Sequence, residues 1–156
     1  MDTGAGISDA VLEFLVSSGE ILLVTTPEPT SITDSYSLLK ALNRHSRFKM
    51  DSTQVKVLAN RVDNEEEGTD LFLKLNAVVT KYLKIPITYL GSVPRDEQLS
   101  KAVMQQSPIS MQNPNAKSAK AFEEIAMKLM DKEVSKSVPK RGMAAFFSHI
   151  LAGRKN

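Results

Sequence analysis

The sequence contains no cysteine, no tryptophan and only two histidines, His45 and His149. Without cysteine the chain forms neither disulfides nor thiolate metal sites, and the two histidines are too far apart in the sequence to form a metal-ligand pair. No apolar run approaches the roughly 20 residues that span a bilayer. The N-terminus also lacks the basic start and apolar stretch of a signal peptide. We therefore expect a cytoplasmic protein.

Charge is distributed unevenly along the chain, although the net charge is only +2. From Lys128 onward there are seven Lys/Arg and two Asp/Glu, a net charge of +5, whereas the preceding residues hold thirteen and sixteen, a net charge of −3. A basic tail predicts an anionic partner, either lipid headgroups or nucleic acid. Nucleic acid ranks last, because aromatic residues make up only 6% of the chain and the basic groups follow no single long face.

Three short apolar runs predict strands, at 21–25, 55–60 and 87–93. Apolar residues at helical spacing predict helices at about 9–18, 31–45, 66–84, 96–106 and 116–133. The two prolines within 26–30 predict a loop without helix, and the continuous apolar run at 21–25 predicts a strand buried on both faces. This alternation of strands and helices predicts an α/β fold with a mainly parallel sheet.

Three strands are few for such a sheet, and the glycine-containing turn at 2–6 has no strand before it. We therefore expect that N-terminal sequence is missing. A sheet that lacks its first strands exposes one edge and one apolar face.

An acid followed by glycines opens the sequence, at Asp2, Gly4 and Gly6. A carboxylate at the end of a strand can hold metal-bound water, and glycines let backbone N–H groups approach a phosphate. The same residues also suit an ordinary tight turn. On its own, this segment has both interpretations.

Two later strands end in residues that suit a purine base. Asn60 offers both a hydrogen-bond donor and an acceptor, and Pro94 and Asp96 follow the third strand. Each has a structural alternative, because Asn60 can cap its own loop and Asp96 can cap a helix. All these loops follow strands of the predicted parallel sheet, so they lie at the edge where such sheets bind ligands.

Four segments in one order carry a resemblance to a known family. They are Asp-Thr-Gly-Ala-Gly-Ile at 2–7, Thr-Thr-Pro-Glu-Pro-Thr-Ser-Ile-Thr-Asp at 25–34, Ala-Asn-Arg at 59–61 and Leu-Gly-Ser-Val-Pro-Arg-Asp at 90–96. From residue 2 to about 130, the chain resembles the second half of the MinD/ParA family of deviant Walker ATPases. It most resembles the flagellar-number regulators of the FlhG group, also called YlxH or FleN.

The resemblance implies roles for particular residues. Asp2 resembles the switch II acid that orders magnesium-bound water, and it is the catalytic and metal-site candidate. The implied nucleotide-binding residues are Gly4, Gly6, Pro27, Glu28, Asn60, Arg61, Pro94 and Asp96. Asp34 is the implied dimer-interface acid, and the family binds ATP with Mg²⁺ and forms homodimers.

The chain departs from the family in lacking a Gly-Lys-Thr or Gly-Lys-Ser motif. In the family this P-loop lies upstream and holds the β- and γ-phosphates. We therefore expect a partial P-loop NTPase-like parallel sheet with flanking helices, without the N-terminal P-loop unit. The isolated chain is expected neither to bind ATP tightly nor to hydrolyse it.

An amphipathic helix is predicted near the C-terminus. Its apolar stripe is Met143, Phe146, Phe147, Ile150 and Leu151, and Lys140 and Arg141 precede it. We expect an ATPase-like half at 1–133, a basic linker at 134–142 and a membrane-targeting helix at 143–156. Docking on the body of the protein or in a partner's groove is the alternative.

These features leave two main functional hypotheses. The first is a portion of a nucleotide-switched positioning ATPase at the inner face of the cell membrane, regulating flagellar number with flagellar assembly proteins as partners. The second is a stand-alone interaction module that binds membranes without catalysis. A MinD/ParA relative acting in chromosome or plasmid partition, or at the division site, is a further alternative.

Overall fold

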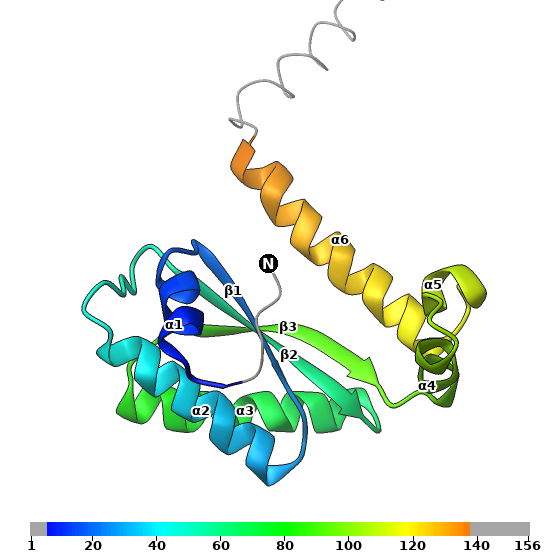
Figure 1. Cartoon of the computed structure of the whole chain (residues 1–156), viewed down its shortest axis with the longest axis horizontal. Helices are drawn as coiled ribbons and strands as arrows, with labels where there is room; N and C mark the ends of the chain where they lie inside the picture. The colour runs from blue at the N-terminus through cyan, green and yellow to red at the C-terminus, as the bar shows by residue number, and fades with distance from the viewer. Residues whose placement is uncertain (1–5, 138–156) are drawn as a thin grey trace, which may run out of the picture. The chain divides into compact units, whose positions relative to one another are not determined.

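The computed structural model describes residues 6–137 and shows three strands alternating with helices (Figure 1). This alternation confirms the predicted α/β class. The chain divides into two compact units, Met1–Phe122 and Glu123–Asn156, and the described residues of the second unit belong to the last helix. The elements in chain order are α1 (Asp9–Val16), β1 (Glu20–Thr25), α2 (Pro29–Arg44), β2 (Gln54–Val62), α3 (Glu65–Tyr82), β3 (Ile87–Pro94), α4 (Glu97–Met104), α5 (Ile109–Gln112) and α6 (Lys117–Ser137).

The strands form a parallel sheet in the order β1-β2-β3, with β2 in the centre. Val55 lies beside Ile21 on one side and beside Ile87 on the other. Because the pairing is parallel, all three strands end at the same edge of the sheet, as the sequence predicted.

The main core lies between one face of this sheet and the helices α1, α2 and α3. Figure 1 shows α2 and α3 lying against the sheet, and both contribute fully buried leucines, such as Leu42 and Leu75. The buried residues of this cluster are Ile21, Leu23, Leu39, Leu42, Val55, Val57, Leu75, Val79, Leu83, Ile85 and Ile87. Burying each large aliphatic side chain stabilises the fold by about 1.5–3 kcal/mol.

The opposite face of β1 is open, which corrects the prediction of a strand buried on both faces. Along β1 the residues alternate between exposed and buried, and Leu22 and Val24 are 44% and 48% exposed. Leu58 and Val93, which share that face on β2 and β3, are buried. The difference arises because, among the described residues, β1 is an edge strand. Sequence periodicity reports what a strand is suited to contact, and residues 6–137 leave this face of β1 largely open.

A buried lysine also lies on this second face. Lys56 is only 2% exposed, and its ammonium group pairs with the carboxylate of Glu20 on β1. A buried cation requires such a partner, because desolvation of an isolated charge is costly.

Two helix boundaries differ from those expected. Pro29 is the first residue of α2 rather than part of a helix-free loop, because its missing N–H would have no intrahelical partner at that position. α6 continues to Ser137, four residues into the segment predicted as a linker.

In α3, Val78 and Tyr82 belong to the predicted inward stripe, but both are exposed.

Close packing of α3 on the sheet depends on a glycine. A Cβ at Gly68 would lie 2.6 Å from Tyr89 Oη, 3.0 Å from Ser92 Cβ and 3.4 Å from Ala59 Cβ. Tyr89 Oη is buried, and it has no hydrogen-bond partner in the described part of the chain. A side chain at position 68 would therefore collide with the Tyr89 hydroxyl and crowd the Cβ atoms of Ser92 and Ala59.

We predict that Gly68→Ala lowers the free energy of unfolding by about 1–2 kcal/mol, because overpacking exceeds the roughly 1 kcal/mol gained in helix propensity. Tyr89→Phe should restore most of this loss, since it removes the nearest atom. Gly19→Ala is the control, because a Cβ there has no neighbour within 4 Å. Urea denaturation measures all three, and an unchanged midpoint for Gly68→Ala would contradict the packing described.

Candidate functional site

The loops that follow the three strands are linked in pairs at the carboxyl edge of the sheet. Arg61, near the end of β2, lies with its Nη1 4.0 Å from Glu28 Oε1 in the loop after β1. The backbone N–H of Arg95, after β3, donates to the Val62 carbonyl at 2.8 Å. Arg95 Nε also lies 3.6 Å from Asp63 Oδ1. The predicted site segments from β1, β2 and β3 are therefore neighbours.

The loop between β1 and α2 is held by Ser31. Its Oγ accepts a hydrogen bond from the Thr26 backbone N–H at 3.0 Å and lies 3.2 Å from Thr25 Oγ1. Ser31 is in the first turn of α2, so one side chain ties the start of the helix to the end of the strand. These contacts fix the positions of Pro27 and Glu28.

Glu28 is a solvent-facing carboxylate whose charge is favoured locally. A hydrogen bond from the Thr26 side chain is the main reason that the pKa of Glu28 lies below its ordinary value, and the charges of Arg61 and Arg95 act in the same direction. Glu28 therefore stays ionised at neutral pH and can accept hydrogen bonds or face a cation.

Asn60 and Arg61 lie at an irregularity in the pairing of β2 with β3. Arg61 has φ of +59°, a left-handed conformation that is uncommon for a residue with a side chain. The Asn60 Oδ1 accepts the Arg61 N–H at 2.9 Å, which is the local capping role expected as the structural alternative. The Asn60 Nδ2 has no hydrogen-bond partner among residues 6–137.

Asp96 acts as a structural clamp. As the N-cap of α4 it accepts from the Gln98 N–H at 2.9 Å, and its second oxygen accepts from the Ser118 N–H at 3.1 Å and the Ser118 Oγ at 2.8 Å. Hydrogen bonds from the backbone of Ser118, first of all, and from its side chain lower the pKa of Asp96. The N-cap alternative is thus confirmed, and both carboxylate oxygens are engaged.

A groove of about 930 Å³ lies beside the end of β1 and the first turns of α2. It brings together four of the predicted residues, Gly6, Glu28, Asp34 and Arg61. Its remaining lining residues are Ile7, Leu23, Val24, Thr26, Thr30, Ser31, Ser35 and Leu38. Gly6 has φ of +118°, a conformation that suits glycine. Asn60, Pro94 and Asp96 are not among the lining residues.

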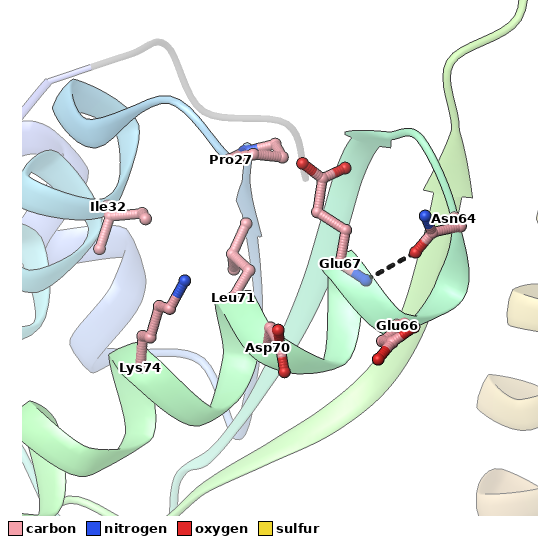
Figure 2. A pocket seen from close by; sticks show the side chains of 8 residues that line it. All are labelled: Pro27, Ile32, Asn64, Glu66, Glu67, Asp70, Leu71 and Lys74. Carbon is pink, nitrogen blue, oxygen red and sulfur yellow. Dashed lines mark hydrogen bonds between the residues drawn. The ribbon is translucent and has the colours of Figure 1, made fainter.

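Pro27 lines a second pocket, of about 340 Å³, instead of the groove that holds Gly6, Glu28, Asp34 and Arg61 (Figure 2). Glu66, Glu67 and Asp70 from the first turns of α3 line it, together with Lys74. The excess of carboxylates makes it unfavourable for phosphate. Figure 2 also shows the Asn64 Oδ1 accepting the Glu67 N–H at 2.9 Å, the cap that begins α3.

The remaining predicted site residues lie outside the described residues. They include Asp2, Gly4 and the stripe of the C-terminal helix, at Met143, Phe146, Phe147, Ile150 and Leu151, with Lys140 and Arg141. Within the described chain, no group of three or more His, Asp or Glu side chains is arranged to hold a metal ion. Between residues 6 and 137, no helix combines the length and apolar character needed to cross a bilayer.

Comparison with known proteins supports the resemblance that the motifs indicated. No protein-family model matches the chain. The antiactivator FleN of Pseudomonas aeruginosa is 41% identical over 129 residues, which cover 83% of this chain and 45% of FleN. The chain belongs to the MinD/ParA family. The flagellum site-determining protein YlxH of Helicobacter pylori, a further relative, is 28% identical over 97% of this chain and 50% of its own length.

Solved MinD/ParA structures share the fold. The septum site-determining protein MinD of Pyrococcus horikoshii, solved in complex with Mg-ADP, matches with a TM-score of 0.57 and 20% sequence identity, over 82% of this chain and 48% of that one. The partial P-loop NTPase-like sheet expected from the sequence is thereby confirmed. The chain spans about half the length of the curated MinD/ParA relatives it matches.

Ser31 and Ser118 hold the candidate segments in place, and sequence reasoning missed both. Ser31 lies within the conspicuous Thr-Pro-Glu-Pro-Thr-Ser segment, and serine hydroxyls commonly hydrogen-bond to the backbone of nearby loop residues. Ser118 lies 22 residues from Asp96, and no local pattern indicates that contact.

We predict that Asp96→Ala lowers the free energy of unfolding by about 2 kcal/mol, because it removes a helix cap and leaves the Ser118 donors without their acceptor. Ser118→Ala should cost less. The double variant should cost less than the sum of the two, since both lose the same contact. Strict additivity in chemical denaturation would show that the clamp is not cooperative.

The lowered pKa of Asp96 gives a second, pH-dependent signature. A carboxylate with a depressed folded pKa contributes stability above its unfolded value, which is near 3.8, and loses it as the pH falls through the folded pKa. Asp96→Asn keeps a capping oxygen but has no charge to titrate. The stability difference between wild type and Asp96→Asn should therefore be constant from about pH 5 to 7 and shrink below about pH 4.

Proposed function

We propose that the chain is the base-recognising and partner-recognising portion of a nucleotide-switched regulator of flagellar number. The observation that carries this proposal is the 41% identity to FleN over 129 residues, which cover 83% of this chain. YlxH, a flagellum site-determining protein, supports the same assignment. The alternatives are a division-site or partition relative, or a stand-alone interaction module.

The described residues fit one part of a nucleotide. Among residues 6–137 the Asn60 amide N–H₂ has no acceptor, and the next residue, Arg61, lies near Glu28; we propose that these groups meet a base and its sugar. The described residues hold no metal-ligand cluster. The chain also lacks the Gly-Lys-Thr/Ser loop that wraps phosphates. In our proposal the described residues therefore bind the nucleoside part of ATP. Asn60 hydrogen-bonds the base, and Arg61 and Glu28 line the entrance to its binding site.

Tight binding of ATP with Mg²⁺ requires the phosphate-binding unit in addition. When bound, the metal nucleotide supplies the charge that distinguishes the switch states of such proteins. In our proposal, Asp2, Gly4 and Gly6 face the phosphate side and Asp34 lies at a homodimer interface. The isolated 156-residue chain then binds ATP weakly and does not hydrolyse it.

A chimera tests the nucleotide proposal. The part of Pseudomonas aeruginosa FleN that precedes the matched region, fused before residue 1 of this chain, should bind a fluorescent ATP analogue in the presence of Mg²⁺. Asn60→Asp keeps the oxygen that accepts the Arg61 N–H but removes the donor, and it should weaken binding about 10-fold, the loss of roughly 1.4 kcal/mol.

Two controls make the chimera decisive. Asn76→Ala alters an amide on α3 that, within the described part of the chain, accepts from the Thr80 hydroxyl one turn away, and it should bind like the unmodified chimera. The same chimera in cells that lack FleN should restore the normal flagellar number. Equal affinity of Asn60→Asp and wild type would refute base reading by Asn60, and no effect on flagellar number would refute the flagellar assignment.

We also propose peripheral membrane association through residues 143–151. The supporting observations are the apolar stripe, the flanking Lys140 and Arg141, and the +5 charge of the tail. Each basic group near an anionic leaflet adds about 1 kcal/mol of attraction. In this proposal the protein works at the inner face of the membrane, with anionic lipid and flagellar assembly proteins as partners.

Liposome co-sedimentation tests this second proposal. The wild-type chain should sediment with vesicles that contain anionic lipid, and Phe146→Glu should reduce the bound fraction at least several-fold, since it places a charge in the apolar stripe. Phe14→Glu, a phenylalanine change at an exposed position of α1, is the matched control. Equal sedimentation of wild type and Phe146→Glu would count against membrane binding.

A further inference from the structure

Charge is separated between the two ends of the sheet. Residues 40–51 hold four Lys/Arg and one Asp, and residues 81–84 add two lysines, a net charge of +5. Residues 63–70 hold five Asp/Glu and no Lys/Arg, a net charge of −5. The acidic segment leads into α3 after the carboxyl end of β2, whereas the basic segments surround the C-terminal ends of α2 and α3. Such a separation gives the two ends opposite electrostatic potentials.

The basic segments form one patch at the amino edge of the sheet. In a parallel sheet each connecting helix runs back to where the next strand begins, so α2 and α3 both end at this edge. Figure 1 shows the two helix ends on the same side of the sheet, at the left of the view. We call the exposed residues here the amino-edge patch: Lys40, Arg44, Arg47, Lys49, Lys81, Tyr82 and Lys84.

Helix ends and ion pairs account for only part of this positive charge. Arg44 and Lys81 lie in the last turns of α2 and α3, where a cation balances the negative end of the helix dipole. Arg47 pairs with Glu13 of α1. Three further cations of the patch are left for an anionic partner, because they form no ion pair among residues 6–137: Lys40, Lys49 and Lys84.

An exposed tyrosine lies within the patch. Tyr82 is 62% exposed, and the ammonium group of Lys81 lies 5.1 Å from the centre of its ring. Phe48, by contrast, packs against the main core. A tyrosine combines an apolar ring with a polar hydroxyl, so it suits the boundary between lipid headgroups and acyl chains, where such residues are enriched.

We propose that the amino-edge patch lies against the anionic headgroups of a membrane leaflet, as a second contact beside residues 143–151. The inference rests on the membrane association proposed above. Stable peripheral anchoring takes two signals, such as one apolar anchor and a polybasic patch, and each basic group near an anionic leaflet raises partitioning roughly five-fold. The same leaflet repels the acidic start of α3, so the carboxyl edge with Glu28 and Asn60 faces away from the membrane.

A lipid surface fits these groups better than nucleic acid does. Proteins commonly hold nucleic-acid phosphates with backbone N–H groups and helix N-termini, whereas this patch surrounds helix C-termini, whose carbonyl oxygens repel a phosphate at close range. Long lysine and arginine side chains can still attract a diffuse layer of headgroups. Binding of single strands also uses a series of stacked aromatic rings, and the described residues of the patch offer one exposed ring, Tyr82.

Co-sedimentation of the full chain with vesicles of phosphatidylcholine and phosphatidylglycerol tests the patch. The triple variant Lys40→Gln/Lys49→Gln/Lys84→Gln should bind at least about 10-fold more weakly than wild type, because it removes three attractive charges. Wild-type binding should also fall as the salt concentration rises. Unchanged binding of the triple variant would overturn the proposal.

A matched control removes the same charge elsewhere. Lys101→Gln/Lys117→Gln/Lys120→Gln changes exposed lysines of α4 and of the first turn of α6, and it should bind like wild type. Equal loss for both triple variants would overturn the proposal, because net charge alone would then explain binding. A fluorescent single-stranded oligonucleotide is the alternative partner. If the patch variant lost oligonucleotide binding but kept vesicle binding, the lipid assignment would be wrong.

Phe146→Glu separates this inference from the proposal for the tail. If Phe146→Glu abolishes vesicle binding and the patch variant does not, the inference fails while the tail proposal stands. If the patch variant abolishes binding and Phe146→Glu does not, the tail proposal fails and the patch is itself the membrane contact.

Site-specific quenching tests the orientation. Because the chain has no cysteine, Ser46→Cys and Ser110→Cys each introduce a single thiol for a fluorescent dye. Both serines are exposed, the first between Arg44 and Arg47 and the second on α5. On vesicles that carry a nitroxide on the lipid headgroup, the dye at position 46 should be quenched several-fold more strongly than the dye at position 110. Equal quenching would overturn the proposal.

Discussion

Parallel hydrogen bonding on both sides of β2 is the constraint on which the rest of the structure depends. It places Ile21, Val55 and Ile87 side by side, so α2 and α3 have a continuous apolar surface to cover. It also makes every strand end at one edge, so that loops distant in the sequence become neighbours. The contacts of Arg61 with Glu28 and of Arg95 with Asp63 follow from this arrangement.

The sequence was sufficient for most of the fold because strand and helix signals are local. The runs at 55–60 and 87–93 lie within β2 and β3. Burial of β1 on both faces was predicted wrongly. The apolar run from Ile21 to Val24 shows that the strand suits apolar contacts on both faces, but it does not show whether the strand lies at the edge of the sheet. The start of α2 at Pro29 was missed because a proline in a helix interior breaks the helix, whereas a proline at the first helical position is favourable.

The candidate site was predictable in outline for a similar reason. Parallel topology alone brings the segments around Glu28, Asn60 and Pro94 to one edge, but it does not decide how each side chain is used. Asp96 was a candidate for base recognition and also for a helix cap. The structure shows one of its oxygens capping α4 at Gln98 and the other accepting from Ser118, a serine 22 residues away that no local pattern connects to it. Hydrogen bonds between residues so far apart in the sequence depend on how the helices pack together, which local sequence patterns do not report.

The exposed leucine and valine of β1 also affect the life of the chain in a cell. Copies whose edge stays uncovered present an unpaired apolar strand, the kind of surface on which aggregation begins and which chaperones and proteases recognise. Copies with a covered edge hide it. Quality control would then remove the excess, so that the steady-state amount of the chain follows the supply of whatever covers Leu22 and Val24.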